Sequence, residues 1–290
     1  MKATRRLRQL LAGDGIVMAP GAHDALAAQL IQQAGFNAAY LSGMGVANAL
    51  AGLPDIGMIT MTEQVMMARY VAKAVSIPVI SDADTGYGNA VNVMRAIQEF
   101  ETAGVAGVHL EDQVFPKRCG HETGKQVVSM EEAAGKIRAA CAARQDPDFV
   151  IIARVDARAP LGLDEAVKRG KAYRDAGADV VFPEALESRE EFAAFAKAFK
   201  GIPLLANMVD FGKSPLLNAE EYRELGYKLV IYPTSCMRVM AKAAGEFLAE
   251  LKRTGTQKSF LNKMRNREEI YELVRFKAFK EVERSYLPKS

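Results

Sequence analysis

The stretch AGVAGVHLED (103–112) carries the pattern that decides the fold. Its first glycine, Gly104, follows a helical stretch, and a glycine in the left-handed conformation ends a helix with the least strain. The apolar residues that follow do not alternate with polar ones, and they end at Glu111 and Asp112. Such a run is typical of a strand covered on both faces, as in a parallel sheet.

The same sequence pattern recurs along the chain, with Ala-Gly or Leu-Gly before an apolar run. With the runs that lack this glycine, eight strands are predicted, at 16–20, 38–42, 77–84, 107–112, 149–156, 179–184, 202–207 and 228–233. Helices are predicted between and after them, at 23–34, 62–75, 90–103, 130–144, 164–176, 188–199, 218–225 and 235–253. Eight alternating units predict an α/β fold, a (β/α)8 TIM barrel, with an open doubly wound sheet as the alternative. No G-x-G-x-x-G motif follows an early strand, which disfavours a dinucleotide-binding sheet.

Composition indicates a soluble globular enzyme. The chain has 290 residues, of which 49% are hydrophobic and 25% charged. A net charge of +3 gives no reason to expect a nucleic-acid partner. No apolar run approaches the roughly 20 residues that cross a bilayer, so no membrane partner is expected. Three cysteines without a C-x-x-C pair suit a reducing compartment, and the cytoplasm is the expected location.

We expect one domain over residues 1–290. The basic N-terminal segment MKATRRLRQLLAGDG suits an amphipathic first helix better than a transit peptide. The segment 254–290 predicts two further helices beyond the barrel, a C-terminal extension whose apolar residues need a surface to cover. That surface is either the protein's own barrel or a neighbouring subunit, and the second choice predicts an oligomer.

Polar side chains gather where the predicted strands end. In a (β/α)8 barrel these ends meet at one mouth, where function concentrates. They supply Tyr40, Ser42, Asp82, Asp84, His109, Glu111, Asp112, Arg154, Asp156, Glu184, Asn207, Thr234 and Ser235. Single acids there could be helix caps, but several carboxylates at one mouth repel one another unless a cation lies among them. Because the candidate ligands are oxygen donors, we expect Mg²⁺, with Mn²⁺ as the alternative.

Asp82 and Asp84 are two residues apart, so on an ideal strand they point the same way and can share one ion. Asp55 lies in a long connection, 52–57, which could fold over the mouth as a small lid. Arg154 and Asn207 suit a substrate carboxylate, since arginine can bind it through two parallel hydrogen bonds.

The segment KRCGH (117–121) places the Cys119 thiol between cations and a histidine. Cationic neighbours favour the thiolate, although the segment could also be a basic surface loop. A metal, carboxylate clamps and a thiol together predict chemistry on a small di- or tricarboxylate, whose enolate the metal stabilises as a carbon–carbon bond breaks. We expect Cys119 to protonate the leaving carbanion, a role that needs the thiol rather than the thiolate.

With these residues in view, the chain resembles the isocitrate lyase and phosphoenolpyruvate mutase superfamily, and within it the short-chain 2-methylisocitrate lyases. The motifs that carry the resemblance are PGAHDA (20–25), YLSG (40–43), GLPD (52–55), DADTGYG (82–88), LEDQ (110–113), KRCGH (117–121), ARVDAR (153–158), FPEA (182–185), LANM (205–208), FGKSP (211–215), YPTS (232–235) and GTQK (255–258).

The resemblance implies a barrel whose eighth helix swaps between paired subunits in a homotetramer, a dimer of dimers. It implies an Mg²⁺ site at Asp82 and Asp84, with Asp55, Glu111 and His109 nearby. It places Ser42, Gly43 and Arg154 at the pyruvate-like end of the substrate, and Glu184 and Asn207 at the succinate-like end. Lys117, Cys119, Gly120 and His121 would form a gating loop, with Cys119 as the acid and Tyr40 as the base. The implied reaction cleaves 2-methylisocitrate to pyruvate and succinate, a step of propionate catabolism in the methylcitrate cycle.

Two positions depart from that pattern. Met44 stands where a glycine is common, and Thr234, before Ser235, stands where an apolar residue is usual. Both could reshape the pocket for the substrate methyl group. The motifs also suit 2,3-dimethylmalate lyases, and carboxyvinyl-carboxyphosphonate phosphorylmutases share the KRCGH-type loop, so both activities stay open as alternatives.

Overall fold

Eight parallel strands form the centre of the larger of two units, Met1–Cys236 and Met237–Ser290, in this computed structural model, which describes residues 1–287. The strands are β1 (Val17–Ala22), β2 (Ala39–Leu41), β3 (Val79–Asp82), β4 (Gly107–Glu111), β5 (Val150–Val155), β6 (Val180–Pro183), β7 (Leu205–Asn207) and β8 (Leu229–Tyr232). Their order is β6-β5-β4-β3-β2-β1-β8-β7. A parallel bridge between Val181 and Leu204, the residue before β7, completes the ring.

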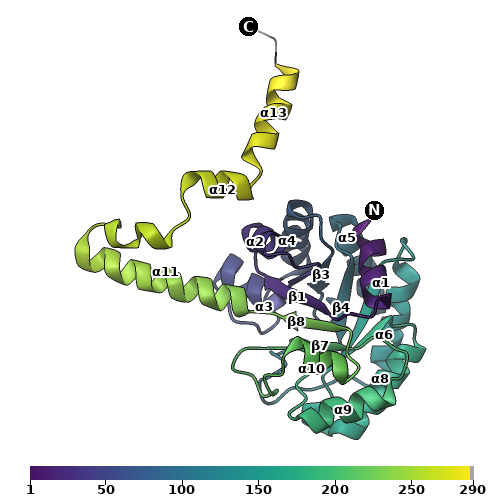
Figure 1. Cartoon of the computed structure of the whole chain (residues 1–290). Coiled ribbons are helices and arrows are strands. Elements are labelled where there is room, and N and C mark those ends of the chain that lie inside the picture. The colour runs from purple at the N-terminus through teal and green to yellow at the C-terminus, as the bar shows by residue number, and fades with distance from the viewer. Residues whose placement is uncertain (288–290) are drawn as a thin grey trace. The chain divides into compact units, whose positions relative to one another are not determined.

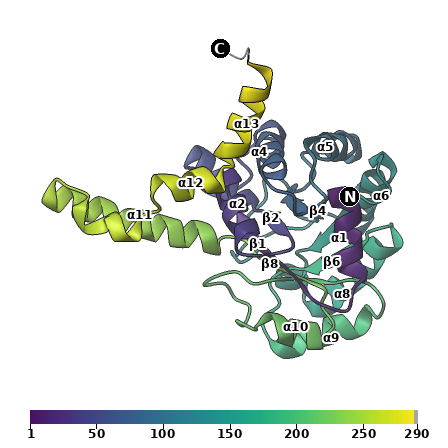
Figure 2. The ribbon, with the colours of Figure 1, turned by 45° about the horizontal axis from the view of Figure 1, so that its top comes forward.

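Helices surround the strands (Figures 1 and 2). They are α2 (Ala25–Gln33), α4 (Met61–Ala74), α5 (Ala90–Ala103), α6 (Met130–Ala143), α8 (Leu163–Asp175), α9 (Arg189–Ala198) and α10 (Ala219–Glu224). Polar side chains cap the first turns of several of these helices. At α4, α5 and α10 the N-cap side chain accepts from the backbone N–H of the third helical residue, whose side chain accepts from the N-cap backbone N–H. Shorter helices, α3 (Gly43–Val46), a π-turn (Ala47–Ala51) and α7 (Arg158–Leu161), lie in the connections.

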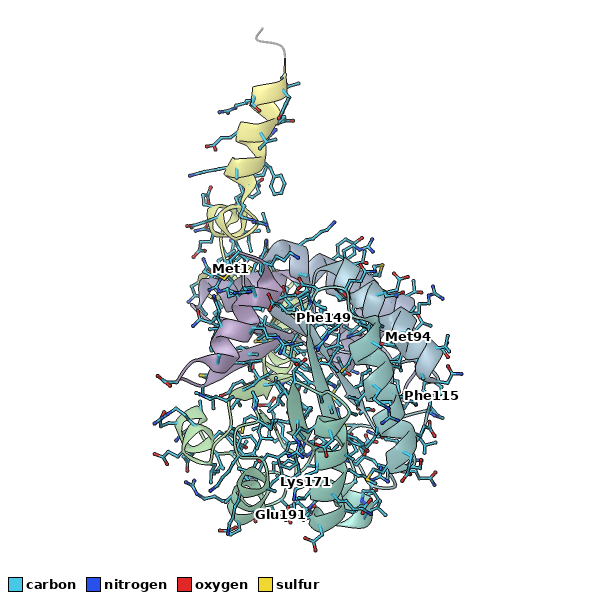
Figure 3. All side chains as sticks on the ribbon, turned by 90° about the vertical axis from the view of Figure 1, so that its right-hand side faces the viewer. Met1, Met94, Phe115, Phe149, Lys171 and Glu191 are labelled. Atoms are coloured by element: carbon cyan, nitrogen blue, oxygen red, sulfur yellow. The ribbon has the colours of Figure 1, made fainter. Side chains whose placement is uncertain are left out.

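The apolar core has two parts. One lies between the strands and the surrounding helices and contains Phe100 and Phe192. The other lies inside the barrel, where Leu7 and Leu11 of α1 (Ala3–Ala12) pack with strand residues such as Ile80. In Figure 3 the labelled Phe149 lies among the strands, whereas Lys171 and Glu191 lie on the outer helices. The first helix is therefore amphipathic as predicted, with Leu7 and Leu11 packed on this inner cluster and Arg5 and Gln9 exposed.

The predicted (β/α)8 fold is confirmed, and all eight predicted strands and helices are present with ends shifted by a few residues. The open doubly wound alternative is excluded by the closing bridge. The shift that matters for the site is at β3, which ends at Asp82, so that Asp84 lies beyond the strand with a left-handed backbone (φ 44°).

The second unit consists of helices. α11 (Ser235–Thr254) leads into it and is followed by a 3-10 turn (Lys258–Lys263), α12 (Arg267–Leu273) and α13 (Phe276–Tyr286). The two predicted helices after residue 253 are therefore confirmed. Phe247 packs against Phe260, and Tyr271 stacks on Phe276, with ring centroids 5.6 and 4.3 Å apart. The homotetramer, the helix swap and the cytoplasmic location stay predictions.

A search of the described helices for a membrane span finds none with the necessary length and apolar character.

Candidate active site

A small cavity of about 40 Å³ lies at the carboxyl ends of the strands. That volume has room for about three water molecules. Its lining residues are Tyr40, Ser42, Met44, Asp55, Asp82, Cys119, Gly120, His121, Arg154, Phe182, Glu184, Asn207, Val209, Ile231, Pro233 and Thr234. Most of the predicted site residues thus surround one space, and the loop residues 119–121 form part of its wall.

Asp82 and Asp84 approach one spot beside α3. A Cβ atom at Gly43 would lie 2.7 Å from Asp82 Oδ2, so glycine leaves room for this carboxylate, and 3.5 Å from Asp84 Oδ1, which is ordinary contact. The Gly43 backbone N–H donates to Asp82 Oδ2 (3.2 Å). The predicted convergence is present, but its cause differs from the predicted one. Asp84 reaches the spot through its left-handed backbone beyond β3, not through strand alternation.

The two carboxylates have opposite pKa shifts. Burial raises the pKa of Asp84 to about 6, with Lys117 opposing that effect. Burial acts in the same sense on Asp82, but His109, Lys117 and Arg154 lower its pKa to about 2. Asp82 is therefore the more firmly ionised of the pair.

Lys117 neutralises the acidic group from the loop side. Its buried ammonium contacts Asp55 Oδ1 and lies 3.0 Å from Asp84 Oδ1. Burial opposes its charge, but these carboxylates raise the pKa of Lys117 well above its usual value. Lys117 does not line the cavity. It holds the loop's first residue against the connection 52–57, as the lid hypothesis for Asp55 requires.

Glu111 lies outside the cavity wall, beneath Arg154. Arg154 Nη1 is 3.1 Å from Glu111 Oε2, yet within residues 1–287 neither oxygen of Glu111 has a hydrogen-bond partner. Burial raises the pKa of Glu111 well above its usual value.

Tyr40 and His109 form a buried pair inside the barrel. Tyr40 Oη lies 2.7 Å from His109 Nε2 and 3.4 Å from Asp82 Oδ2. Burial raises the pKa of Tyr40 well above its usual value and lowers the pKa of His109. The phenol is therefore protonated at neutral pH and the imidazole is neutral, and the two groups share one short hydrogen bond between Tyr40 Oη and His109 Nε2.

Cys119 lies in a less polar environment than its sequence neighbours suggest. Burial raises the pKa of its thiol, and the charges of Asp55 and Glu184 act in the same direction. The prediction that Lys117 and Arg118 favour the thiolate is wrong, because Lys117 is paired with carboxylates and Arg118 is exposed. The thiol form is the one that a proton donor needs.

Glu184, Asn207 and His121 form a connected polar group. Asn207 Nδ2 donates to both oxygens of Glu184 (3.2 and 3.1 Å), and His121 Nε2 lies 2.8 Å from Glu184 Oε1. His121 Nδ1 accepts from the Lys213 backbone N–H (3.0 Å), so Nε2 carries the ring proton. Despite burial, Arg154 and His121 hold the pKa of Glu184 well below its usual range.

Met44, Thr234 and Ser42 line the cavity, whereas Ser235 does not. Ser42 caps α3 by accepting from the Gly45 N–H (3.2 Å). Ser235 donates to both oxygens of Asp210 (3.0 and 2.9 Å), and Thr234 Oγ1 lies 3.5 Å from the same carboxylate. Asp210 thus fixes the segment that brings Thr234 to the cavity.

Several wall residues were not predicted. Phe182, Val209, Ile231 and Pro233 supply apolar surface. Phe182 and Ile231 belong to predicted strands, but an unbroken apolar run does not say which side chains face the mouth. Lys125, buried beside the site, was also missed, since nothing in the polar segment around it marks one lysine as buried.

The acidic group suits a hard cation. Among residues 1–287, no three Asp, Glu, His or Cys side chains are grouped closely enough to hold a metal ion. Mg²⁺, however, usually keeps several waters and takes only one or two protein carboxylates. Asp84 Oδ1 is buried beside Asp82, and the Lys117 ammonium lies 3.0 Å from it. These oxygen donors fit Mg²⁺.

Comparison with known proteins decides the family. The model of the phosphoenolpyruvate phosphomutase family matches residues 7–252. The chain belongs to this family. A 2,3-dimethylmalate lyase of Eubacterium barkeri is 46% identical to it over 99% of both chains. A 2-methylisocitrate lyase of Aeropyrum pernix is 47% identical over 92% of this chain and 86% of the relative.

Solved structures agree with the fold. A crystal structure of 2,3-dimethylmalate lyase superposes with a TM-score of 0.92 at 37% identity, covering 97% of this chain and 94% of that one. Phosphonopyruvate hydrolase in complex with oxalate and Mg²⁺ superposes with a TM-score of 0.89 at 37% identity, covering 99% and 100%. The predicted superfamily and the class of carbon–carbon lyase are confirmed, whereas the roles of individual site residues stay predictions.

Proposed function

We propose that this member of the phosphoenolpyruvate phosphomutase family cleaves 2-methylisocitrate to pyruvate and succinate, with Mg²⁺ as its cofactor. The observation that carries the proposal is the Cys119 thiol in the same cavity wall as Arg154 and Asp82. This cavity combines a proton donor, a cation for a carboxylate, and an oxygen ligand for a metal. Relatives named 2-methylisocitrate lyase, 42–47% identical to the chain, support the choice of substrate.

Tyr40 is the proposed base for the substrate hydroxyl. Because its pKa is raised, it can take that proton only as it gives its own to His109 Nε2, 2.7 Å away. The neutral imidazole is ready to accept it. Mg²⁺ held by Asp82 and Asp84 would stabilise the enolate of the 2-oxo acid fragment.

Cys119 is the proposed acid for the other fragment. As the carbon–carbon bond breaks, the leaving carbon atom takes the thiol proton, and the resulting thiolate is stabilised by the Arg154 charge. The loop around Cys119 forms part of the cavity wall, and its full closure over a substrate would exclude water that competes as proton donor.

The second substrate end would bind at Asn207 and Arg154, with His121 paired to Glu184 beside them. Glu184 is ionised, so it repels a substrate carboxylate and would act by orienting its two hydrogen-bond partners. The remaining N–H groups of Asn207 and Arg154 are the donors for that carboxylate.

A second candidate is cleavage of 2,3-dimethylmalate. It is favoured by the relative of that name, which matches this chain over 99% of both lengths. Met44 and Thr234 lie in the cavity wall, where they would contact the substrate's alkyl substituents.

The deciding experiment measures kcat/KM for release of the 2-oxo acid with Mg²⁺ on 2-methylisocitrate, isocitrate and 2,3-dimethylmalate. We expect 2-methylisocitrate to be preferred. Preference for 2,3-dimethylmalate would replace the first candidate by the second, and turnover of none of the three would refute both.

A further inference from the structure

Lys125 is a buried lysine that the proposed reaction does not use. Only 6% of the residue is exposed. Its ammonium lies 2.9 Å from Asp156 Oδ1, which is fully buried, and donates to the backbone carbonyl of Gly120. A buried charge needs such partners, because it has lost its hydration.

The Gly120 carbonyl belongs to the loop that forms part of the cavity wall. The backbone approaches so closely there that a Cβ atom at Gly120 would lie 2.6 Å from both Arg154 Nη2 and Glu184 Cδ. Lys117 holds the first residue of the loop through Asp55 and Asp84. Lys125 binds the Gly120 carbonyl near the end of the loop, so a buried lysine fixes each end of it.

Asp156 is a rigid anchor for this contact. Its backbone N–H donates to Asp112 Oδ1 (2.8 Å), and Asp112 in turn accepts from Arg169 (3.1 Å) and Tyr173 (2.7 Å) of α8. Asp156 also pairs with Arg154 through two contacts. The Asp156 carboxylate therefore binds both Lys125, which contacts the loop, and Arg154, which lines the cavity.

The loop must open during turnover. A cavity of about 40 Å³ holds about three waters, which is less than a dicarboxylate needs. Since residues 119–121 form its wall, displacing them is the direct way to enlarge it. The contact between Lys125 and the Gly120 carbonyl would then break on opening and form again on closure.

We propose that Lys125 is a positioning residue that latches the loop 117–121 closed by joining the Gly120 carbonyl to Asp156. The latch sets the fraction of time for which Cys119 is enclosed and aligned with the substrate. The catalytic purpose of closure rests on the proposed function, but the latch itself can be measured without turnover.

The first test follows alkylation of Cys119 by iodoacetamide in the full-length protein, with peptides resolved by mass spectrometry. Lys125→Met should raise the rate at Cys119 about tenfold, the factor that corresponds to loss of roughly 1.4 kcal/mol from the closed state. Cys141, on α6, serves as an internal reference and should react at an unchanged rate. Lys136→Met, which removes a lysine paired with Glu132 within α6, is the matched control and should leave both rates unchanged.

An unchanged Cys119 rate in folded Lys125→Met protein would overturn the latch, whatever the substrate proves to be. Lys125→Gln keeps a donor without the charge and should give an intermediate rate, so it decides the question if Lys125→Met does not fold. Failure of both variants to fold would assign Lys125 to the stability of the core and also overturn the proposal.

Steady-state kinetics on the preferred substrate provide the second test. Lys125→Met should lower kcat about tenfold with a smaller change in KM, since alignment after binding is what is lost. Lys125→Arg should recover most of kcat, because it restores a charged donor. Equal loss in Lys125→Arg and Lys125→Met would contradict a latch made by the charge.

Discussion

Arg154 and Asp156, two residues apart around the end of β5, form a two-point ion pair, with Nε–Oδ2 and Nη2–Oδ1 distances of 2.8 and 3.1 Å. The Nε and Nη2 groups, which together could bind a substrate carboxylate through two parallel hydrogen bonds, are thus already paired with Asp156. Nη1 points instead toward Glu111, 3.1 Å away. Arg154 therefore meets a substrate with a fixed orientation, and only its remaining N–H groups are available for binding.

Replacing the thiol should separate catalysis from folding. Cys119→Ser should reduce kcat by about 10²–10⁴, the usual contribution of a general acid, with an unchanged melting temperature. Cys141→Ser, which alters a thiol on α6, is the control and should retain full kcat. Near-normal turnover of Cys119→Ser would remove Cys119 from the mechanism.

The pH dependence should follow the raised pKa of Cys119. Because burial favours the thiol, the donor stays protonated through neutral pH and is lost only as pH rises above the usual thiol range of about 8.5. We expect both the loss of kcat and the rise in iodoacetamide reactivity on the alkaline side. An alkylation midpoint below pH 8 would show that the thiolate is favoured after all.

Removing one carboxylate of the acidic group should weaken Mg²⁺ binding. Asp84→Asn preserves a residue that tolerates the left-handed backbone, so the fold should persist. Titration calorimetry should show Mg²⁺ affinity lower by at least about 10–100-fold, together with loss of activity. Asp164→Asn, on the exposed side of α8, is the control. Unchanged Mg²⁺ affinity in Asp84→Asn would show that Asp84 is not a ligand of the metal ion.

The barrel closure between β1 and β8 should be sensitive to one glycine. A Cβ atom at Gly21 would lie 2.0 Å from the Pro233 carbonyl oxygen, which is backbone and cannot rotate away. Gly21→Ala should therefore lower the free energy of unfolding by about 1–3 kcal/mol or more. At Gly15 nothing lies within 4 Å of the added atom, so Gly15→Ala should change it little. If Gly21→Ala and Gly15→Ala have equal free energies of unfolding in urea denaturation, the close approach of Gly21 to the Pro233 carbonyl is contradicted.

Oligomer formation should depend on the C-terminal helices. Exposed apolar side chains on the 3-10 turn Lys258–Lys263 and on α13 include Leu261, Phe279 and Val282. If they contact another subunit, truncation after Thr256 should lower the mass measured by light scattering. An unchanged mass would assign these helices to packing within one chain.

The order and type of the helices and strands follow from the amino-acid sequence. Each depends on local properties: apolar runs, glycine at helix ends and polar caps, which act within a few residues. It also predicted the set of polar residues at one mouth, because parallel strands of a barrel all end on the same side.

Only the tertiary structure decided how those residues act on one another. The Cys119 thiol illustrates this, since its adjacent cations are paired or exposed while burial by distant segments raises its pKa. Asp84 reaches Asp82 by a left-handed turn that strand periodicity does not predict. Lys125 meets Asp156 across 31 residues of chain. Ionisation, burial and pairing depend on neighbours in space, which local sequence patterns do not contain.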